Sequence, residues 1–286
     1  MKMNPKRSLR GFTLVEMAIV LLIAGVAAGL VLSSSSAMLD AQKRKTVREQ
    51  LNTIDIALAN FVAQNKRLPC PARGTIATGA LNAGVELVGP PPGAVAPGTC
   101  NLNSQVDGVV PWVTLGLAES VATDPWNGRM TYRVDPVLAR AAPFPPQMNM
   151  SDCDPAGAGA VAAGLCLAPC AGATCTSPTN FLALKGLNVQ NGTGGFLNNS
   201  AAGTGAAYVI ISHGPNGMGA RNSSGNLQPV AGAGANEMPN FNNRTIVANI
   251  FMDAQLDITA TPFDDYLSHP TIMSVLYKAN LGPRAH

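Results

Sequence analysis

An apolar segment of 21 residues, Phe12 to Leu32, constrains this chain more than any other feature of its sequence. At about 1.5 Å per residue, a helix of this length reaches across a hydrocarbon core of roughly 30 Å. We therefore expect a single membrane-spanning helix here. Glu16 lies inside the segment, and a carboxylate in a bilayer costs about 2.5 to 3.5 kcal/mol on insertion scales, so it is normally retained for a partner.

Flanking charge does not orient this helix, because four basic residues precede the apolar segment and four follow it: Lys2, Lys6, Arg7 and Arg10 before it, and Lys43, Arg44, Lys45 and Arg48 after it. A secretory signal is the alternative, with cleavage at Ser35-x-Ala37 and a mature chain starting near Met38. The apolar segment is longer than the roughly 7 to 15 residues of a signal, and a signal has no need of Glu16.

The residues that open the segment, Arg10-Gly11-Phe12-Thr13-Leu14-Val15-Glu16, closely resemble the processing site of type IV pilins and type II secretion pseudopilins. In that family a prepilin peptidase cuts after the glycine and methylates the new amino terminus. The resemblance implies cleavage between Gly11 and Phe12, which removes a leader of residues 1–11 and keeps the anchor. It also implies that Glu16 pairs with the Phe12 amine of a neighbouring subunit and sets the axial register during assembly.

The helix is expected to continue beyond the membrane. Apolar residues recur every three or four positions on one face, at Val47, Leu51, Ile54, Leu58 and Phe61. Pro69 cannot continue a helix. The pattern predicts a helix over 12–67, with a transmembrane part at 12–32 and an amphipathic part at 40–66 that packs against a globular head at 68–286.

The head is expected to be rich in loops. The chain has 29 Gly, 22 Pro and only 12% charged residues, although a hydrophobic fraction of 47% is enough for a core. Strands are predicted at 109–113, 130–134, 207–212 and 244–251, and they are separated by Gly-rich loops at 154–175, 191–206 and 214–243. The expected fold is α+β and pilin-like, a long N-terminal helix packed on an antiparallel sheet with long disulfide-stapled loops.

Six cysteines all lie after residue 69, which indicates an oxidising compartment: Cys70, Cys100, Cys153, Cys166, Cys170 and Cys175. Their spacing lacks the paired CxxC of a zinc site. Proximity in sequence favours a bond between Cys70 and Cys100, and the remaining four cysteines would then staple the Gly/Ala-rich segment. Other pairings stay open.

Five short motifs of the head follow one another in the order found in a group of minor pilin-like subunits, and in outline they resemble the major pseudopilin of type II secretion: 67–72, 111–117, 124–128, 212–217 and 263–267. In that pseudopilin, loops near the third and last of these motifs bind calcium. The resemblance makes Asp264 and Asp265, with Asn216 or Glu237, candidate oxygen ligands. No regular ligand spacing is present, and the sequence predicts no cofactor or metal. Trp126, presented by the turn 124–128, is expected to pack on the helix.

No catalytic constellation is present. Ser212 and His213 are neighbours in a predicted strand and point to opposite faces, which does not suit a nucleophile and its base. His213 is expected to close a loop by hydrogen bonding. The net charge of +3 and the absence of a basic segment with stacking aromatics argue against a nucleic-acid partner.

The sequence therefore predicts a structural subunit, not an enzyme: a minor pilin or pseudopilin of a type IV pilus or a type II secretion pseudopilus. Its expected partners are a prepilin peptidase, other pilin or pseudopilin subunits, an inner-membrane assembly platform and the inner membrane itself. Before assembly it would cross the inner membrane once, with a periplasmic head, and afterwards it would lie in a periplasmic or extracellular filament. The alternative is an adhesin-like binding module that uses the filament for display, because long loops on a rigid scaffold suit recognition.

Overall fold

The computed structural model describes residues 13–89, 98–100, 106–159, 164–229, 234–241, 250–256 and 263–286, and for residues 27–37 it describes the backbone alone. The chain divides into two compact units, residues 1–45 and 46–286, and each is described by itself. The predicted leader, Gly11 and Phe12 lie outside the described residues.

Helix α1 runs from Leu14 to Asn65 without a break. Its end at Asn65 lies one residue before the predicted end of the amphipathic part and two before the predicted end of the helix. The next residue, Lys66, has a φ of 54°, which places its backbone in the left-handed region. In the first unit the apolar side chains from Leu14 to Val26 are exposed. Within the part of the chain that the structure describes, no helix combines the length and the apolar character needed to cross a membrane.

In the second unit, α1 packs one face against the head, as its periodicity predicts. Val47, Ile54 and Leu58 are fully buried and Leu51 nearly so. The last predicted member of this face is different, because Val62 is fully buried while Phe61 is only half-buried and lies under the Arg67 guanidinium, 5.1 Å from the ring centroid. The buried face therefore ends one position further along, as a spacing of four from Leu58 allows.

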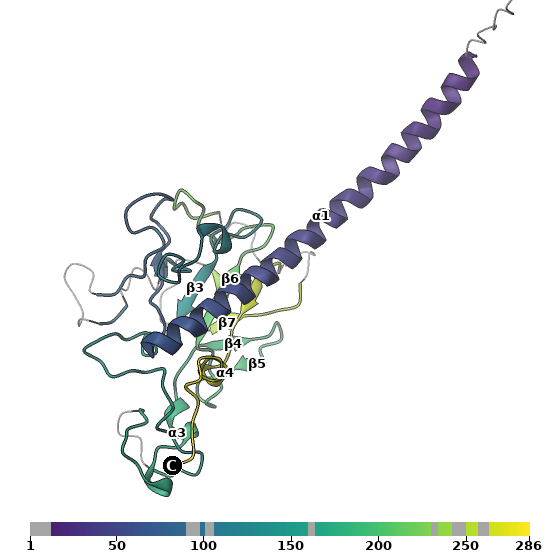
Figure 1. The fold of residues 1–286 in the computed structure, drawn as a ribbon. Helices are drawn as coiled ribbons and strands as arrows, with labels where there is room; N and C mark the ends of the chain where they lie inside the picture. The colour runs from purple at the N-terminus through teal and green to yellow at the C-terminus, as the bar shows by residue number, and fades with distance from the viewer. Residues whose placement is uncertain are drawn as a thin grey trace, which may run out of the picture. The chain divides into compact units, whose positions relative to one another are not determined.

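A five-stranded antiparallel sheet lies against this half of α1, which crosses β3 and β6 in Figure 1. Its order is β1 (Ala72–Arg73), β2 (Gly108–Val109), β3 (Thr131–Val134), β6 (Tyr208–Ser212) and β8 (Tyr266–Ser268). Every residue of β3 and β6 is buried, so both faces of the sheet centre are covered. Asp55 ties α1 to the sheet, because it accepts hydrogen bonds from the Tyr208 hydroxyl at 2.9 Å and the Ser268 hydroxyl at 2.7 Å.

A second, three-stranded sheet has the order β5 (Phe196–Asn198), β4 (Asn188–Gln190) and β7 (Ile250–Met252). This sheet is mixed, because β4 pairs antiparallel with β5 but parallel with β7. The predicted antiparallel pairing therefore holds for the first sheet and for one of the two pairs of the second. The head also contains the short helices α3 (Pro178–Leu182) and α4 (Ile272–Lys278), and three 3-10 turns, η1 (Glu119–Val121), η2 (Gly172–Thr174) and η3 (Met238–Asn240).

The four predicted strands correspond to β2, β3, β6 and β7. The first was predicted too long: β2 ends at Val109, and Trp112 N–H donates back to the Val110 carbonyl in a turn, because Pro111 between them has no N–H to offer a ladder. Residues 244–249 of the last predicted strand lie outside the described residues.

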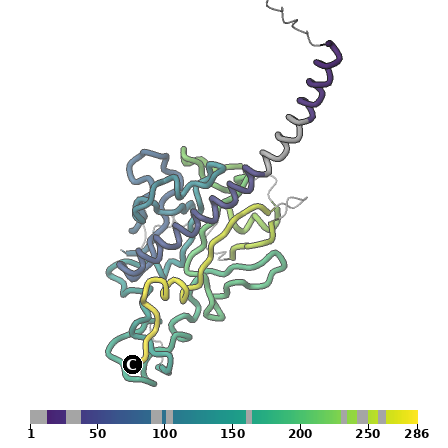
Figure 2. Tube along the Cα trace, turned by 45° about the vertical axis from the view of Figure 1, so that its right-hand side comes forward, coloured from purple at the N-terminus to yellow at the C-terminus, as the bar shows by residue number. Residues whose placement is uncertain are grey.

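Three disulfides join the six cysteines as Cys70–Cys100, Cys153–Cys166 and Cys170–Cys175. The predicted first bond is confirmed, and the other two staple the Gly/Ala-rich segment. The C-terminal tail runs beside this segment in Figure 2, with Arg284 N–H donating to the Cys153 carbonyl and His286 N–H to the Asp154 carboxylate. The tail and the stapled loops therefore form one subassembly.

Candidate functional site

The first turn of α1 carries a reciprocal cap. Glu16 Oε2 accepts from the backbone N–H of Thr13 at 2.8 Å and from its hydroxyl at 2.9 Å, and Glu16 N–H donates to Thr13 Oγ1 at 3.2 Å. This is the capping-box arrangement of Thr and Glu three positions apart. Glu16 Oε1 makes no hydrogen bond with the described residues, so one oxygen of the carboxylate stays open to a further donor.

Three carboxylates meet at one end of the head. Glu237 immediately precedes η3, and Asp264 and Asp265 immediately precede β8. One oxygen of each lies within 4.8 Å of the others. Two of these side chains are held by neutral donors: Glu237 Oε1 accepts from Asn216 Nδ2 at 3.0 Å and from Asp264 N–H at 3.1 Å, and Asp265 Oδ2 accepts from Asn240 Nδ2 at 2.8 Å.

Asp264 is the unsatisfied member of this acidic cluster. Its Oδ2 accepts from Asn216 N–H at 3.1 Å, but its Oδ1 is buried and has no hydrogen-bond donor. Burial, together with the neighbouring carboxylates of Glu237 and Asp265, raises the pKa of Asp264 to about 7. Three crowded carboxylates with an orphaned oxygen match the chemistry of a hard divalent cation, which takes oxygen ligands and removes the like-charge repulsion.

Asn216 and Glu237, the two alternative third ligands, differ in the hydrogen bonds that their side chains make. Both polar atoms of the Asn216 side chain make hydrogen bonds, because its Nδ2 donates to Glu237 and its Oδ1 accepts from Met218 N–H at 2.9 Å. Among the described residues, Glu237 Oε2 accepts only a long hydrogen bond of 3.3 Å from Gly234 N–H. The structure therefore joins Glu237 to Asp264 and Asp265 and assigns Asn216 to positioning Glu237.

Ser212 and His213 do not act on one another. Ser212 Oγ donates to Asp124 Oδ2 at 2.7 Å, whereas His213 Nε2 contacts Thr131 Oγ1 at 2.7 Å. Asp265 Oδ1 lies 3.6 Å from His213 Nδ1, so Thr131, His213 and Asp265 follow the order of a nucleophile, a base and an acid. Thr131 and His213 are both fully buried, which denies a substrate access. The contact of His213 Nε2 with Thr131 is a hydrogen bond of the core, whereas the buried His213 Nδ1 has no hydrogen-bond partner among the described residues. The His213 carbonyl also closes the next loop by accepting from Gly217 N–H.

The turn 124–128 is held by one side chain. Asp124 Oδ1 accepts from Trp126 N–H at 3.0 Å and Gly128 N–H at 2.8 Å, and Asn127 takes a positive φ of 67°, which Asn tolerates better than most residues. The Trp126 ring stacks on Tyr266 with centroids 5.9 Å apart. We expected Trp126 on the helix; its aromatic contact comes from β8 instead.

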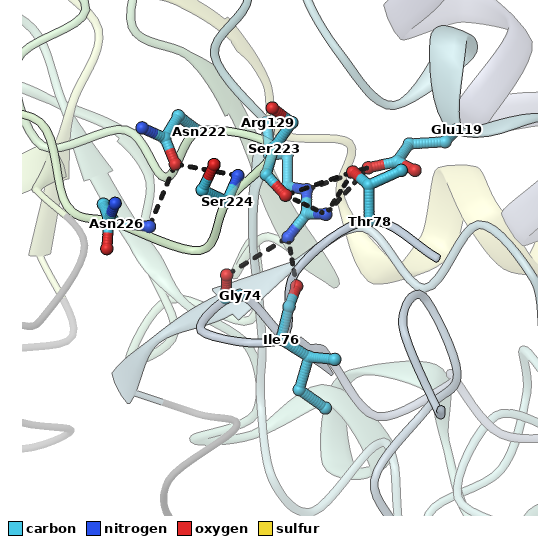
Figure 3. A network of polar contacts seen from close by, with 9 residues as sticks. All are labelled: Gly74, Ile76, Thr78, Glu119, Arg129, Asn222, Ser223, Ser224 and Asn226. Carbon is cyan, nitrogen blue, oxygen red and sulfur yellow. Dashed lines mark hydrogen bonds and ion pairs between the residues drawn. The ribbon is translucent and has the colours of Figure 1, made fainter. Parts of the chain in front are cut away.

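Arg129 was not anticipated from the sequence. It is almost completely buried, and Figure 3 shows its guanidinium between the backbone of Gly74 and Ile76 and the side chains of Thr78 and Glu119. It also donates to the Ser223 carbonyl at 3.2 Å. The only sequence signal is a charged residue directly before the apolar run that becomes β3, and this does not show where its partners lie.

Residues 6–32 match the family model described as the prokaryotic N-terminal methylation motif, which is the signature of type IV pilins and pseudopilins. The chain thus carries the N-terminal segment of that class of filament subunit, and the resemblance deduced from residues 10–16 is confirmed. No curated protein and no solved structure matches the chain.

Proposed function

We propose that this chain is a minor subunit of a type IV pilus or a type II secretion pseudopilus. A prepilin peptidase cuts it between Gly11 and Phe12 and methylates the new amine, the segment 12–32 anchors it in the inner membrane, and the assembly platform inserts it into a filament through α1. A head of this size with long loops suits a low-copy position better than a close-packed repeating one.

The observation that carries this proposal is the arrangement at the start of α1. Apolar side chains from Leu14 to Val26 are exposed, and the carboxylate among them, Glu16, uses one oxygen to cap its own helix and leaves the other open. An isolated carboxylate among apolar groups is costly unless a cation joins it. The Phe12 amine of a neighbouring subunit supplies that cation.

Two measurements test the proposal. Mass spectrometry of the native protein is expected to give an N-methylated amino terminus at Phe12; a mature chain starting near Met38 would refute it. Incorporation of Glu16 variants into sheared filaments then tests the carboxylate. Glu16→Gln keeps a side chain suited to a capping box but removes the charge, so we expect it to lose incorporation as fully as Glu16→Ala does, while cleavage continues.

Asp40→Ala is the matched control, because Asp40 is an exposed carboxylate on the same helix outside the apolar segment. It should assemble normally. If Glu16→Gln assembles like the unaltered protein, the carboxylate acts through helix capping and the proposed pairing with an amine is wrong.

We also propose that the acidic cluster of Glu237, Asp264 and Asp265 binds calcium, supported by the buried and undonated Asp264 Oδ1. A bound ion would supply positive charge, hold the loop before η3 to the loop before β8, and stiffen this end of the head. Thermal unfolding of the purified full-length protein is the test: calcium at about 100 times its dissociation constant adds roughly 2.7 kcal/mol of stability.

The calcium-dependent shift should vanish in Asp264→Asn and persist in Asp152→Asn, a carboxylate outside the cluster. Magnesium, which prefers a smaller octahedral site, should give a weaker shift. An equal calcium shift in Asp264→Asn would show that the ion binds elsewhere.

A further inference from the structure

A cavity of about 190 Å³ opens between three turns of the head. The residues that line it do not include Glu237, Asp264 or Asp265 of the acidic cluster. The turn 126–128 supplies one wall, the turn 215–217 a second, and Asn222, Ser223 and Gln228 the third. This volume is below the roughly 300 to 1,000 Å³ of sites for drug-sized molecules, so the cavity suits one small ring.

The walls are fixed by hydrogen bonds within the protein, some of them made by the lining residues Asn216 and Asn222. Asp124 holds the first turn, as described above, and Asn216 holds the second through Asp264 and Glu237. The third belongs to a tight turn in which Asn222 Oδ1 accepts from Ser224 N–H and Asn226 N–H, each at 3.0 Å. Figure 3 shows this turn beside Arg129, which binds the Ser223 carbonyl. The cavity is therefore preorganised.

Several polar groups in the lining take no part in the hydrogen bonds that hold the turns. Among the described residues, no hydrogen bond is made by the side-chain amides of Asn127 and Gln228, by Asn222 Nδ2 or by the indole N–H of Trp126. Side-chain amides offer both donors and acceptors. Unused groups of this kind around an aromatic ring form a surface that is apolar on one side and hydrogen-bonding on the others.

The chemistry of the lining selects the ligand. None of the described residues that line the cavity carries a charged side chain, so neither an anion nor a cation is favoured. A pyranose ring presents C–H groups on one face, which pack on an aromatic ring, and hydroxyl groups around its rim, which act as both donors and acceptors. We propose that this cavity binds a neutral sugar unit of a glycan. The proposal does not depend on the role of the chain in a filament.

Saturation-transfer NMR tests the proposal on the full-length processed protein, in a detergent without a sugar headgroup. The probes are glucose, galactose, mannose, N-acetylglucosamine and N-acetylgalactosamine, and a single ring in so small a site should bind with a dissociation constant of roughly 1 mM. At least one pyranose is expected to receive saturation from the protein. Sorbitol, which has the hydroxyls of glucose but no ring face, should receive none.

Asn127→Gly removes one cavity amide without straining the turn, because glycine accepts a positive φ. Asn82→Gly is its matched control, since Asn82 has a φ of 65° and lies outside the cavity. We expect Asn127→Gly and Gln228→Ala each to weaken sugar binding by about 2- to 10-fold and Asn82→Gly to leave it unchanged. Equal binding by Asn127→Gly and Asn82→Gly, equal signals from sorbitol and glucose, or no signal from any of the five sugars would each overturn the assignment.

Discussion

Replacing Arg129 with methionine tests how the head holds its loops. The guanidinium makes six hydrogen bonds to five residues: Gly74, Ile76, Thr78, Glu119 and Ser223. Its side chain is fully buried, and that of Glu119 is 24% exposed. Methionine fills much of the same volume but donates no hydrogen bond. The Gly74 and Ile76 carbonyls therefore lose their donor and Glu119 loses its cation, while the Ser223 carbonyl still accepts from Thr78 N–H.

The expected loss is set by the unpaired groups that remain. Removing one partner of a buried ion pair costs about 3 to 5 kcal/mol. Water reaching the partly exposed Glu119 keeps the cost from rising to the sum of six separate hydrogen bonds. For a unit of this size, each kcal/mol lowers the melting temperature by roughly 2 to 4 °C. We therefore expect a decrease of about 6 to 20 °C.

Thermal unfolding followed by tryptophan fluorescence is the assay, because Trp112 is buried and its ring lies 5.1 Å from Arg129 Cζ. Arg129→Lys keeps the charge but not the planar fork of donors, so it should fall between methionine and the unaltered protein. Arg284→Met, an exposed arginine with one long hydrogen bond of 3.3 Å, is the control. A melting temperature for Arg129→Met within about 2 °C of the control would refute the reasoning, since that corresponds to less than 1 kcal/mol.

Three further predictions follow from contacts in the head. In calcium-free buffer, the pKa of Asp264 is raised to about 7 from its ordinary value of 3.8, so the folded state holds a proton that the unfolded state releases. Stability should therefore fall as pH rises from about 4 to 7, by about 1 to 2 kcal/mol after solvent screening. Asp264→Asn should flatten this profile, measured by urea unfolding at each pH. A disulfide stabilises a protein by restricting its unfolded chain, and more so when it closes a longer loop. Removing the Cys70–Cys100 bond, which spans 30 residues, by a double serine variant should cost about 3 to 4 kcal/mol, whereas removing Cys170–Cys175, which spans 5, should cost about 2 kcal/mol. Equal losses in urea unfolding would argue against this dependence on loop length. Asp55→Ala should cost about 2 to 4 kcal/mol in the same assay because the Tyr208 and Ser268 hydroxyls lose a charged acceptor. No loss relative to Asp40→Ala would show that these two hydrogen bonds do not hold α1 to the sheet.

The features that the sequence predicted well are local or periodic. The processing motif is seven consecutive residues, and the buried face of α1 follows a spacing that any helix imposes. Strands β3 and β6 lie in apolar stretches long enough to be recognised. The first disulfide joins the two cysteines that come first in the chain. For the motif, the helix face and the strands, the information needed lies in a short stretch of sequence, and for the disulfide the order of the cysteines along the chain was enough.

The features that the sequence did not predict depend on pairing between distant segments. Strands β1, β4, β5 and β8 have only two or three residues each, which is too few to show an alternating pattern. The parallel pairing of β4 with β7 joins residues about sixty positions apart, such as Val189 and Phe251. Phe61 was placed on the buried face because it lies three residues after Leu58, but Val62 takes that place and the Arg67 guanidinium lies over the Phe61 ring.

The acidic cluster was predicted only in part for the same reason. Asp264 and Asp265 are adjacent in sequence and conspicuous, and Glu237 was one of two alternatives for the third position. What separates Glu237 from Asn216 is a set of hydrogen bonds between turns that lie some twenty residues apart. The sugar cavity could not be predicted at all, because three separate turns form it and each reads as an ordinary loop.

The assembly segment and the sugar cavity belong to different compact units, residues 1–45 and 46–286, and share no hydrogen-bond partner among the described residues. Substitutions at sites without shared partners combine additively to within about 0.5 kcal/mol. Glu16→Gln should therefore abolish incorporation into the filament and leave the dissociation constant for the bound sugar unchanged. Asn127→Gly should raise that dissociation constant and leave incorporation unchanged. A filament that excludes Asn127→Gly would show that the cavity contacts another subunit during assembly and not a glycan.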